Sequence, residues 1–432
     1  MKRRELLKNS TVALSSIFFT NSLTGCSKSK EKIKRTSAPR VVVIGGGSGG
    51  ISVAKVIKKA EPSVEVIVVE RKKKYITCYG SNWTFNDMFT MEDITFDYRN
   101  LTTKHSISLV HAEVTGLEQE TKRVLLSDNS YLEYDRLVVS PGISFRWDNI
   151  EGLDKSTTES IPHAWKAGKQ TEILKSQINN MPDKGTFVMC IPPNPFRCPP
   201  GPYERASLIA NYFKKHKPQA KIILLDAKDK FSKMNKFQQG WEKYYGYGSD
   251  NAMLEWVSNF DGGSVKSVDA KKKIVTTVDG EKFKADVINY IPTQKANITA
   301  DKMGLVDKTG WCSIDPETFE SVNIPFVHVI GDASISSMAK SAFAANSQAS
   351  LCGNAVANLI MGKEHNHKPS IFNQCFSLIT PSHGISVLDA FQVENNIVKR
   401  TGGGIFPIDG KYAREADSAR AWYSNITGTL FN

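Results

Sequence analysis

The sequence predicts an α/β fold with two Rossmann-like three-layer domains and a C-terminal α+β interface region. Three observations support this prediction. A strand, a glycine-rich turn, a helix and a second strand follow one another in residues 40–72, and a similar strand–helix–strand unit fills residues 185–226. Residues 114–142 and 265–293 share one pattern of alternating strands, which is an internal repeat. With 432 residues, the chain is long enough for two or three packed domains.

The first unit, RVVVIGGGSGGISVAKVIKKAEPSVEVIVVERK, has the glycine spacing of a dinucleotide-binding turn. Gly45 permits the tight turn, Gly47 lets the backbone approach a pyrophosphate, and Gly50 lets the helix pack closely on the strand. The helix N-terminus then faces the phosphates. Glu70 closes the second strand and can accept a hydrogen bond from a ribose hydroxyl. We therefore expect a dinucleotide site in this unit.

The repeat suggests that the two domains are related. Its copies are VTGLEQETKRVLLSDNSYLEYDRLVVSPG and VKSVDAKKKIVTTVDGEKFKADVINYIPT. Each is expected to form strand, turn, strand, turn, strand, with an apolar last strand after an aspartate. Each domain should therefore contain a three-stranded crossover.

The second unit keeps the strand–helix–strand order but changes the turn. GTFVMCI predicts a strand, YERASLIANYFKKH a helix, and KIILLD a strand that ends in Asp226. The turn between the first strand and the helix, PPNPFRCPPGP, contains six prolines. Proline has no N–H group, and a phosphate cradle is built from backbone N–H groups. We expect this domain to offer a nucleotide only the ribose contact of Asp226, so that NAD(P)H is not a partner.

The dinucleotide of the first domain is expected to be FAD. The stretch HVIGDAS predicts a strand that ends at Gly331 and Asp332, and in two-domain flavoproteins this aspartate meets the ribityl chain. Taken alone, the pair could also be a turn with a capping aspartate. A helix follows, and its N-terminus could stabilise an anionic reduced flavin. Arg71 and Gln348 complete the predicted cofactor contacts.

The N-terminus predicts export. Arg3 and Arg4 precede a short apolar run, VALSSIFF, which is too short to span a bilayer. The run ends in LTGC, which looks like a lipoprotein cleavage box with Cys26 as the lipidated residue; the alternative is a plain secretory signal with a chance cysteine. Nine basic and two acidic side chains lie in residues 1–36, so the net charge of +12 is mostly local and nucleic acid is not an expected partner.

Six motifs in order resemble the flavoprotein subunit of flavocytochrome c sulfide dehydrogenase, within the FAD-dependent pyridine nucleotide-disulfide oxidoreductase-like superfamily. The resemblance covers nearly the whole chain from residue 39 onward. The motifs are YITCYGSN, PHAWKAGKQT, FRCPPGPYERAS, GDASI with KSAFAANSQ, NQCFSLITPSHGISV and AWYSNI.

The resemblance implies roles for three cysteines. Cys78 matches the cysteine that bonds covalently to FAD, whereas by itself it could be a small buried hydrophobe. Cys198 and Cys375 match a redox-active disulfide over the flavin, whereas a bare pair in an exported chain could be a structural staple. The prolines would hold Cys198 where a nicotinamide would otherwise approach. The cysteines that read as core thiols, without metal-ligand spacing, are Cys190, Cys312 and Cys352.

The resemblance also implies a mechanism. HS⁻ attacks one sulfur of the Cys198–Cys375 disulfide and gives a persulfide and a thiolate. The electron pair passes to FAD, zero-valent sulfur leaves as polysulfide, and a c-type cytochrome takes the electrons singly. Glu204 is a candidate acid or base, or else a first-turn carboxylate that favours the helix dipole. Trp422 either lies between the flavin and the partner or is an ordinary core tryptophan.

The predicted organisation follows from these motifs. It comprises a twin-arginine lipoprotein-type signal (1–26), a linker (27–38), the FAD-binding domain in two parts (39–150 and 294–360), the second Rossmann-like domain without an NAD site (151–293) and the C-terminal region (361–432). We expect a periplasmic protein, tethered to the membrane only through a lipid.

Two rival functions remain open. A sulfide:quinone oxidoreductase shares the fold and the sulfur chemistry, but it usually has a C-terminal amphipathic membrane segment, and the tail READSARAWYSNITGTLFN is polar. A flavin-binding interaction protein without turnover is the other. No C-x-x-C-H motif occurs, so we expect any haem to come from another chain.

Overall fold

The computed structural model describes residues 35–364 and 370–432. The predicted signal and most of the predicted linker lie outside these residues. Within them, none of the helices combines the length and the apolar character needed to cross a bilayer.

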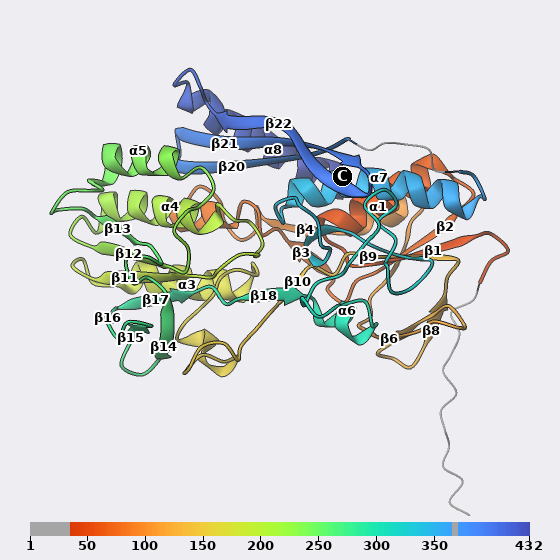
Figure 1. Cartoon of the computed structure of the whole chain (residues 1–432), viewed down its shortest axis with the longest axis horizontal. Helices are drawn as coiled ribbons and strands as arrows, with labels where there is room; N and C mark the ends of the chain where they lie inside the picture. Colours follow the sequence, from red (N-terminus) through yellow and green to blue (C-terminus); the bar gives the residue numbers. More distant parts are fainter. Residues whose placement is uncertain (1–34, 365–369) are drawn as a thin grey trace, which may run out of the picture.

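The first domain is built on a five-stranded parallel sheet in the order β19-β9-β1-β2-β5. Its central strands are apolar runs, and β1 is fully buried, as expected for a sheet covered on both faces. Helices α1 and α7 pack against each other on one side of it (Figure 1). The bounds are β1 Arg40–Ile44, α1 Ser48–Ala60, β2 Glu65–Val69, β5 Ser108–Val110, β9 Arg136–Val139, β19 Val327–Val329 and α7 Ala342–Ile360.

The second domain has a four-stranded parallel sheet in the order β13-β12-β11-β17. Helix α4 follows β11 after the proline-rich loop and packs against α5. The bounds are α3 Lys169–Asn180, β11 Thr186–Ile191, α4 Gly201–His216, β12 Lys221–Asp226, α5 Met234–Tyr245, β13 Leu254–Val257 and β17 Val287–Tyr290.

Each domain contains the three-stranded crossover that the repeat predicts, although each repeat forms four strands in all where the strand–turn pattern predicted three. In each copy the second strand pairs with both the first and the third. Three antiparallel strands therefore precede the apolar strand that joins the parallel sheet. The two resulting three-stranded sheets lie on the same side of the molecule (Figure 1). Their strands are β6 Val114–Glu118, β7 Arg123–Leu126, β8 Tyr131–Glu133, β14 Val265–Asp269, β15 Ile274–Thr277 and β16 Lys282–Lys284.

A short antiparallel ribbon joins the domains where the chain crosses between them. Strand β10 carries the chain out of the first domain, and β18 brings it back. The crossing strands and the remaining short elements are β3 Lys74–Ile76, η1 Ser81–Asn86, β4 Thr95–Asp97, α2 Arg99–Thr103, β10 Ile143–Phe145, η2 Ser156–Glu159, β18 Gln294–Ala296, α6 Ile298–Lys302 and η3 Gly331–Ala333.

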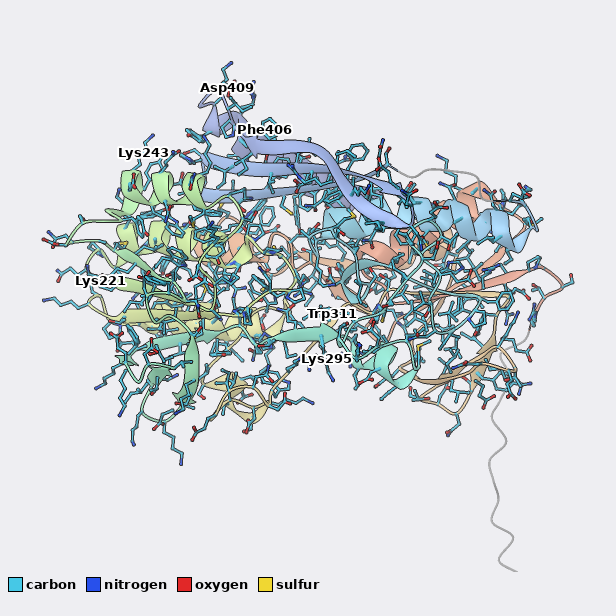
Figure 2. The ribbon with its side chains drawn as sticks, viewed as in Figure 1. Lys221, Lys243, Lys295, Trp311, Phe406 and Asp409 are labelled. Carbon is cyan, nitrogen blue, oxygen red and sulfur yellow. The ribbon has the colours of Figure 1, made fainter. Side chains whose placement is uncertain are left out.

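The C-terminal region is an antiparallel sheet of three long strands backed by one helix. These are β20 Ser370–Thr380, β21 His383–Glu394, β22 Ile397–Phe406 and α8 Tyr412–Phe431. Strand β20 contacts α4 of the second domain and α7 of the first, so the sheet spans both (Figure 1). Side chains fill the space between the layers, whereas Lys243 and Asp409 project from the outer surface (Figure 2).

Candidate active site

A cavity of about 430 Å³ opens where the first domain, the proline-rich loop and β20 meet. This volume is within the usual range of ligand sites. Eight of the predicted site residues besides Glu204 line it: Gly45, Gly47, Glu70, Arg71, Cys78, Cys198, Asp332 and Cys375. Segments as far apart in sequence as those of Gly45 and Cys375 therefore form one site.

The glycine-rich turn at one end of the cavity leaves no room for a side chain at Gly45 or Gly50. Gly45 has a φ of +105°, and a Cβ on it would lie 2.3 Å from the carbonyl oxygen of Ser140. A Cβ on Gly50 would lie 1.8 Å from the carbonyl oxygen of Gly45, so Gly50 allows close packing and does not itself line the cavity. Glu70 accepts a hydrogen bond from the N–H of Gly46 at 2.8 Å and so holds the turn. This cradle fits a pyrophosphate.

Another part of the wall comes from the second predicted cofactor motif. Asp332 lines the cavity, and burial raises the pKa of its carboxyl. The α7 N-terminus reaches the same wall through Ser341, whose hydroxyl accepts from the N–H of Ala344 and caps the helix. Gln348 is placed differently from the prediction: among the residues described, it is not part of the lining. It accepts from the N–H of Gly331 at 2.7 Å and therefore positions the turn behind the cavity wall.

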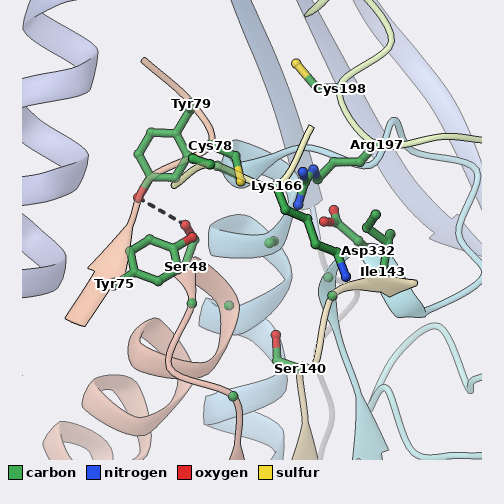
Figure 3. Close-up of a pocket in the computed structure, with 18 of the residues that line it drawn as sticks. Ser48, Tyr75, Cys78, Tyr79, Ser140, Ile143, Lys166, Arg197, Cys198 and Asp332 are labelled. Atoms are coloured by element: carbon green, nitrogen blue, oxygen red, sulfur yellow. Dashed lines mark hydrogen bonds between the residues drawn. The ribbon is translucent and has the colours of Figure 1, made fainter. Parts of the chain in front are cut away.

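Cys78 lies in the loop between β3 and η1, and its side chain points into the cavity (Figure 3). Two tyrosines flank it, Tyr75 and Tyr79, and Tyr79 shares a hydrogen bond of 3.2 Å with Ser48 in the first turn of α1. The loop is thus tied to the dinucleotide-binding helix. This location suits the predicted bond to FAD, which remains a prediction.

Cys198 and Cys375 reach the same cavity from different domains. Cys198 sits in the proline-rich loop at a φ of +57°, and its N–H donates to the carbonyl of Lys340 at 2.7 Å. Cys375 is in the middle of β20 and is 9% exposed. The structure has both as free thiols, so their disulfide remains a prediction. Cys190, Cys312 and Cys352 are buried, as predicted for core thiols.

Glu204, in the first turn of α4, is a fully engaged acceptor. Nδ2 of Asn82 donates to it at 2.9 Å, Nε1 of Trp83 at 3.3 Å, and the N–H of Leu378 at 3.0 Å. Burial nevertheless raises the pKa of its carboxyl. The carboxylate therefore joins α4 to η1 and β20. The sequence suggested an acid or base, or a carboxylate that favours the helix dipole, and neither of these roles includes this link.

The cations that line the cavity and were not found from the sequence include Lys166 and Arg197. Lys166 and Arg197 converge beside Asp332 and below Cys78 (Figure 3). Arg197 donates to the carbonyl of Trp165, whereas the ammonium of Lys166 has no hydrogen-bond partner within the described chain. Burial, together with Arg197, lowers the pKa of Lys166 to about 8. The motif PHAWKAGKQT contained Lys166, but only the fold shows that its ammonium faces the site.

Asp226 requires a correction, because it is not available to a ribose. Its side chain is fully buried and accepts from the hydroxyl of Tyr203 at 2.5 Å and from Nε1 of Trp256 at 3.0 Å. It also pairs with Lys228. The ring of Tyr203 stacks on Phe231 with centroids 3.7 Å apart. Aromatic side chains thus occupy the end of β12 where the predicted ribose contact was expected.

Trp422 of α8 lines the cavity and is partly exposed. Its ring meets Tyr79 edge-on at 5.6 Å and lies 6.1 Å from Phe376. Trp422 packs on other aromatic residues and is also partly exposed. It is therefore not an ordinary core tryptophan, and a position between the flavin and the partner remains a prediction. Among the described residues, no three His, Cys, Asp or Glu side chains gather in a way that could hold a metal ion.

Three family models match parts of the chain. Pyridine nucleotide-disulphide oxidoreductase matches residues 39–177. The central part of the sulfide dehydrogenase [flavocytochrome c] flavoprotein chain matches residues 171–292, and the flavin-binding part of flavocytochrome c sulphide dehydrogenase matches residues 367–431.

Curated relatives include two kinds of sulfide-oxidising flavoprotein. A mitochondrial sulfide:quinone oxidoreductase of Dictyostelium discoideum is 26% identical over 370 residues, which cover 84% of this chain and 80% of the relative. The flavoprotein chain of sulfide dehydrogenase [flavocytochrome c] from Chlorobaculum thiosulfatiphilum is 54% identical over 43 residues, 10% of this chain and 90% of that sequence.

Solved structures share the fold. The sulfide:quinone oxidoreductase of Aquifex aeolicus has a TM-score of 0.70 at 16% identity and covers 91% of this chain and 92% of its own. A NAD-dependent persulfide reductase from A. fulgidus has a TM-score of 0.61 at 15% identity, over 88% of this chain and 76% of its own. The α/β class with two dinucleotide-binding-type domains is thus confirmed.

Proposed function

The chain belongs to the flavocytochrome c sulfide dehydrogenase flavoprotein family of FAD-dependent sulfide oxidoreductases, and on this premise we propose that it oxidises sulfide to zero-valent sulfur and passes the electrons to a c-type cytochrome. One observation carries the proposal: three cysteines from separate segments, Cys78, Cys198 and Cys375, line the cavity that the glycine-rich turn forms.

The residues around the cavity fit FAD. The turn from Gly45 to Gly47 and the α7 N-terminus would hold the pyrophosphate and the flavin edge, Asp332 the ribityl chain, and Cys78 the ring system through a covalent bond. When bound, FAD would accept an electron pair from an active-site sulfur and release the electrons one at a time.

The protein's own part in the reaction is sulfur exchange at the proposed Cys198–Cys375 disulfide. HS⁻ bonds to one sulfur and breaks the S–S bond, so that one cysteine carries a persulfide and the other keeps the bonding pair as a thiolate. Lys166 and Arg197 make this part of the cavity positive, which favours entry of an anion such as HS⁻. The proline-rich loop holds Cys198 in place through its bond to Lys340.

The electron acceptor distinguishes the proposal from its alternative. Two of the three family models support a cytochrome, whereas a relative aligned over most of the chain is a sulfide:quinone oxidoreductase, which favours a quinone. Trp422 and Tyr79 would give electrons a short aromatic route from the flavin edge to the surface. A flavin-binding protein without turnover is the third candidate.

The test uses purified protein with FAD bound. NADH, NADPH and sulfide are mixed with it separately under anaerobic conditions, and the flavin absorbance is followed. We expect sulfide to bleach the flavin and the nicotinamides to leave it oxidised. Horse-heart cytochrome c and a soluble quinone are then compared as acceptors. Faster turnover with the quinone would favour the alternative, and absence of bleaching by sulfide would leave only a non-catalytic role.

We also propose a periplasmic location with a lipid tether at Cys26. The support is the twin-arginine signal and the LTGC box of the sequence. Palmitate labelling of the wild type and of Cys26→Ser in the native host tests it. Equal labelling of both would exclude the tether.

A further inference from the structure

Lys233 is a buried lysine that lies next to Cys375 although the two belong to different parts of the fold. It immediately precedes α5 in the second domain, is 2% exposed and has a left-handed φ of +64°. Its Nζ donates to the carbonyl oxygen of Cys375 and to Oγ of Ser377, both at 2.9 Å. The second domain therefore places an ammonium group against the middle of β20.

The ammonium lies on the face of β20 that carries the sulfur. Cys375 and Ser377 are two residues apart in a strand, so their side chains point to the same face. An ammonium has three N–H donors, and two of those of Lys233 are used in these hydrogen bonds. One donor therefore remains for a negatively charged neighbour.

Lys233 forms no ion pair with a carboxylate in the part of the chain that the structure describes, although burial of a charge is costly. Burial lowers the pKa of Lys233 to about 8, and the nearby Cys375 opposes this shift. The Cys375 thiol donates a hydrogen bond to Oδ1 of Asn373, which also accepts from the hydroxyl of Ser341. The other titratable groups that face these two residues are Cys198, Glu204, Asp389 and Glu415.

From this geometry we infer that Lys233 is a positioning residue that holds a positive charge beside Cys375 and stabilises a negative charge on its sulfur. The inference rests on the proposed function, in which HS⁻ opens the disulfide and leaves one cysteine with the bonding pair. Lys233 stabilises this state when the charge lies on Cys375. It also ties the reactive strand to the second domain.

The experiment measures the acidity of the thiol without sulfide. FAD-loaded protein, reduced with dithiothreitol, is treated with iodoacetamide between pH 6 and 10, and modification of the Cys375 and Cys198 peptides is quantified by mass spectrometry. Lys233→Met removes the charge, Lys233→Gln keeps hydrogen-bonding capacity without charge, and Lys233→Arg keeps the charge. Lys236→Met, in the first turn of α5, is the matched control. Thermal unfolding shows which variants are folded.

Loss of an opposite charge at this range should raise the pKa of a thiol by at least about one unit, so Cys375 should react about tenfold more slowly below that pKa in Lys233→Met and Lys233→Gln. Lys233→Arg and Lys236→Met should keep the wild-type profile, and Cys198 should change less. If Lys233→Met does not fold, Lys233→Gln decides. An unchanged Cys375 profile in a folded uncharged variant, or an equal loss in Lys233→Arg, would overturn the inference. Because no sulfide is present, failure of sulfide oxidation alone would instead count against the proposed function.

Discussion

Replacing Glu204 with glutamine should destabilise the protein, because the side chain is surrounded by donors. Oε2 of Glu204 accepts from Asn82, and Oε1 accepts from Trp83 and Leu378. An amide has one oxygen, so its NH₂ group must face one of these donors. It cannot gain an acceptor by a flip of Asn82, because Oδ1 of Asn82 already accepts from Nε of Arg205 at 3.0 Å.

The magnitude follows from the lost contact. A hydrogen bond to a charged acceptor contributes roughly 1.5–3 kcal/mol, and a buried donor without an acceptor costs about 1–3 kcal/mol. Glu204→Gln also removes the unfavourable burial of a charge, which offsets part of this sum. We expect a net loss of about 2–4 kcal/mol in the free energy of unfolding at pH 7.

Urea and thermal unfolding, followed by tryptophan fluorescence, measure the effect. The matched control is Glu172→Gln, which changes an exposed carboxylate in the first turn of α3 and should shift neither transition. Because burial raises the pKa of Glu204 in the folded state, its contribution to stability is greatest at low pH and declines as the pH rises through that pKa. The difference between wild type and Glu204→Gln should therefore depend on pH. Superimposable curves for the two proteins at all pH values would refute the reasoning.

Three further predictions concern the cavity. Cys78→Ser should move the yellow colour from the acid-precipitated pellet to the supernatant, and colour that is already in the supernatant for the wild type would contradict covalent attachment. Gly50→Ala should abolish FAD binding, measured by the absorbance ratio of flavin to protein, since its Cβ would lie 1.8 Å from the carbonyl oxygen of Gly45; Gly402→Ala, with open space around its Cβ, is the control and should bind normally. Lys166→Met should flatten the pH dependence of stability. The pKa of Lys166 is lowered from 10.5 to about 8 in the folded protein, so the unfolded chain binds more protons between these two pH values. The stability of the wild type should therefore rise relative to that of the variant between pH 8 and 10.5. Parallel profiles of melting temperature against pH for the two proteins, from pH 7 to 10.5, would contradict a lowered pKa for Lys166.

The sequence determined most of the fold because its signals are local. The glycine spacing around Gly45 can be satisfied only by a tight turn between a strand and a helix, and the repeated strand pattern needs no knowledge of the partner strands. The prolines before Cys198 likewise remove N–H donors wherever the loop lies. The fourth strand of each repeat was missed because short polar segments such as Lys282–Lys284 acquire their structure from pairing alone.

Only the tertiary structure decided what the charged residues do. Asp226 ends a strand as a ribose ligand should, but Tyr203 and Trp256, from other elements, cover it. Glu204 meets donors from two other segments, η1 and β20, and Lys233 reaches Cys375 across a domain boundary. The contacts of Glu204 and Lys233 join residues more than a hundred positions apart, and neither periodicity nor motif spacing encodes them. The physical reason is that the environment of a buried charge is set by packing between elements, whereas the elements themselves are set by local backbone preference and hydrophobic period.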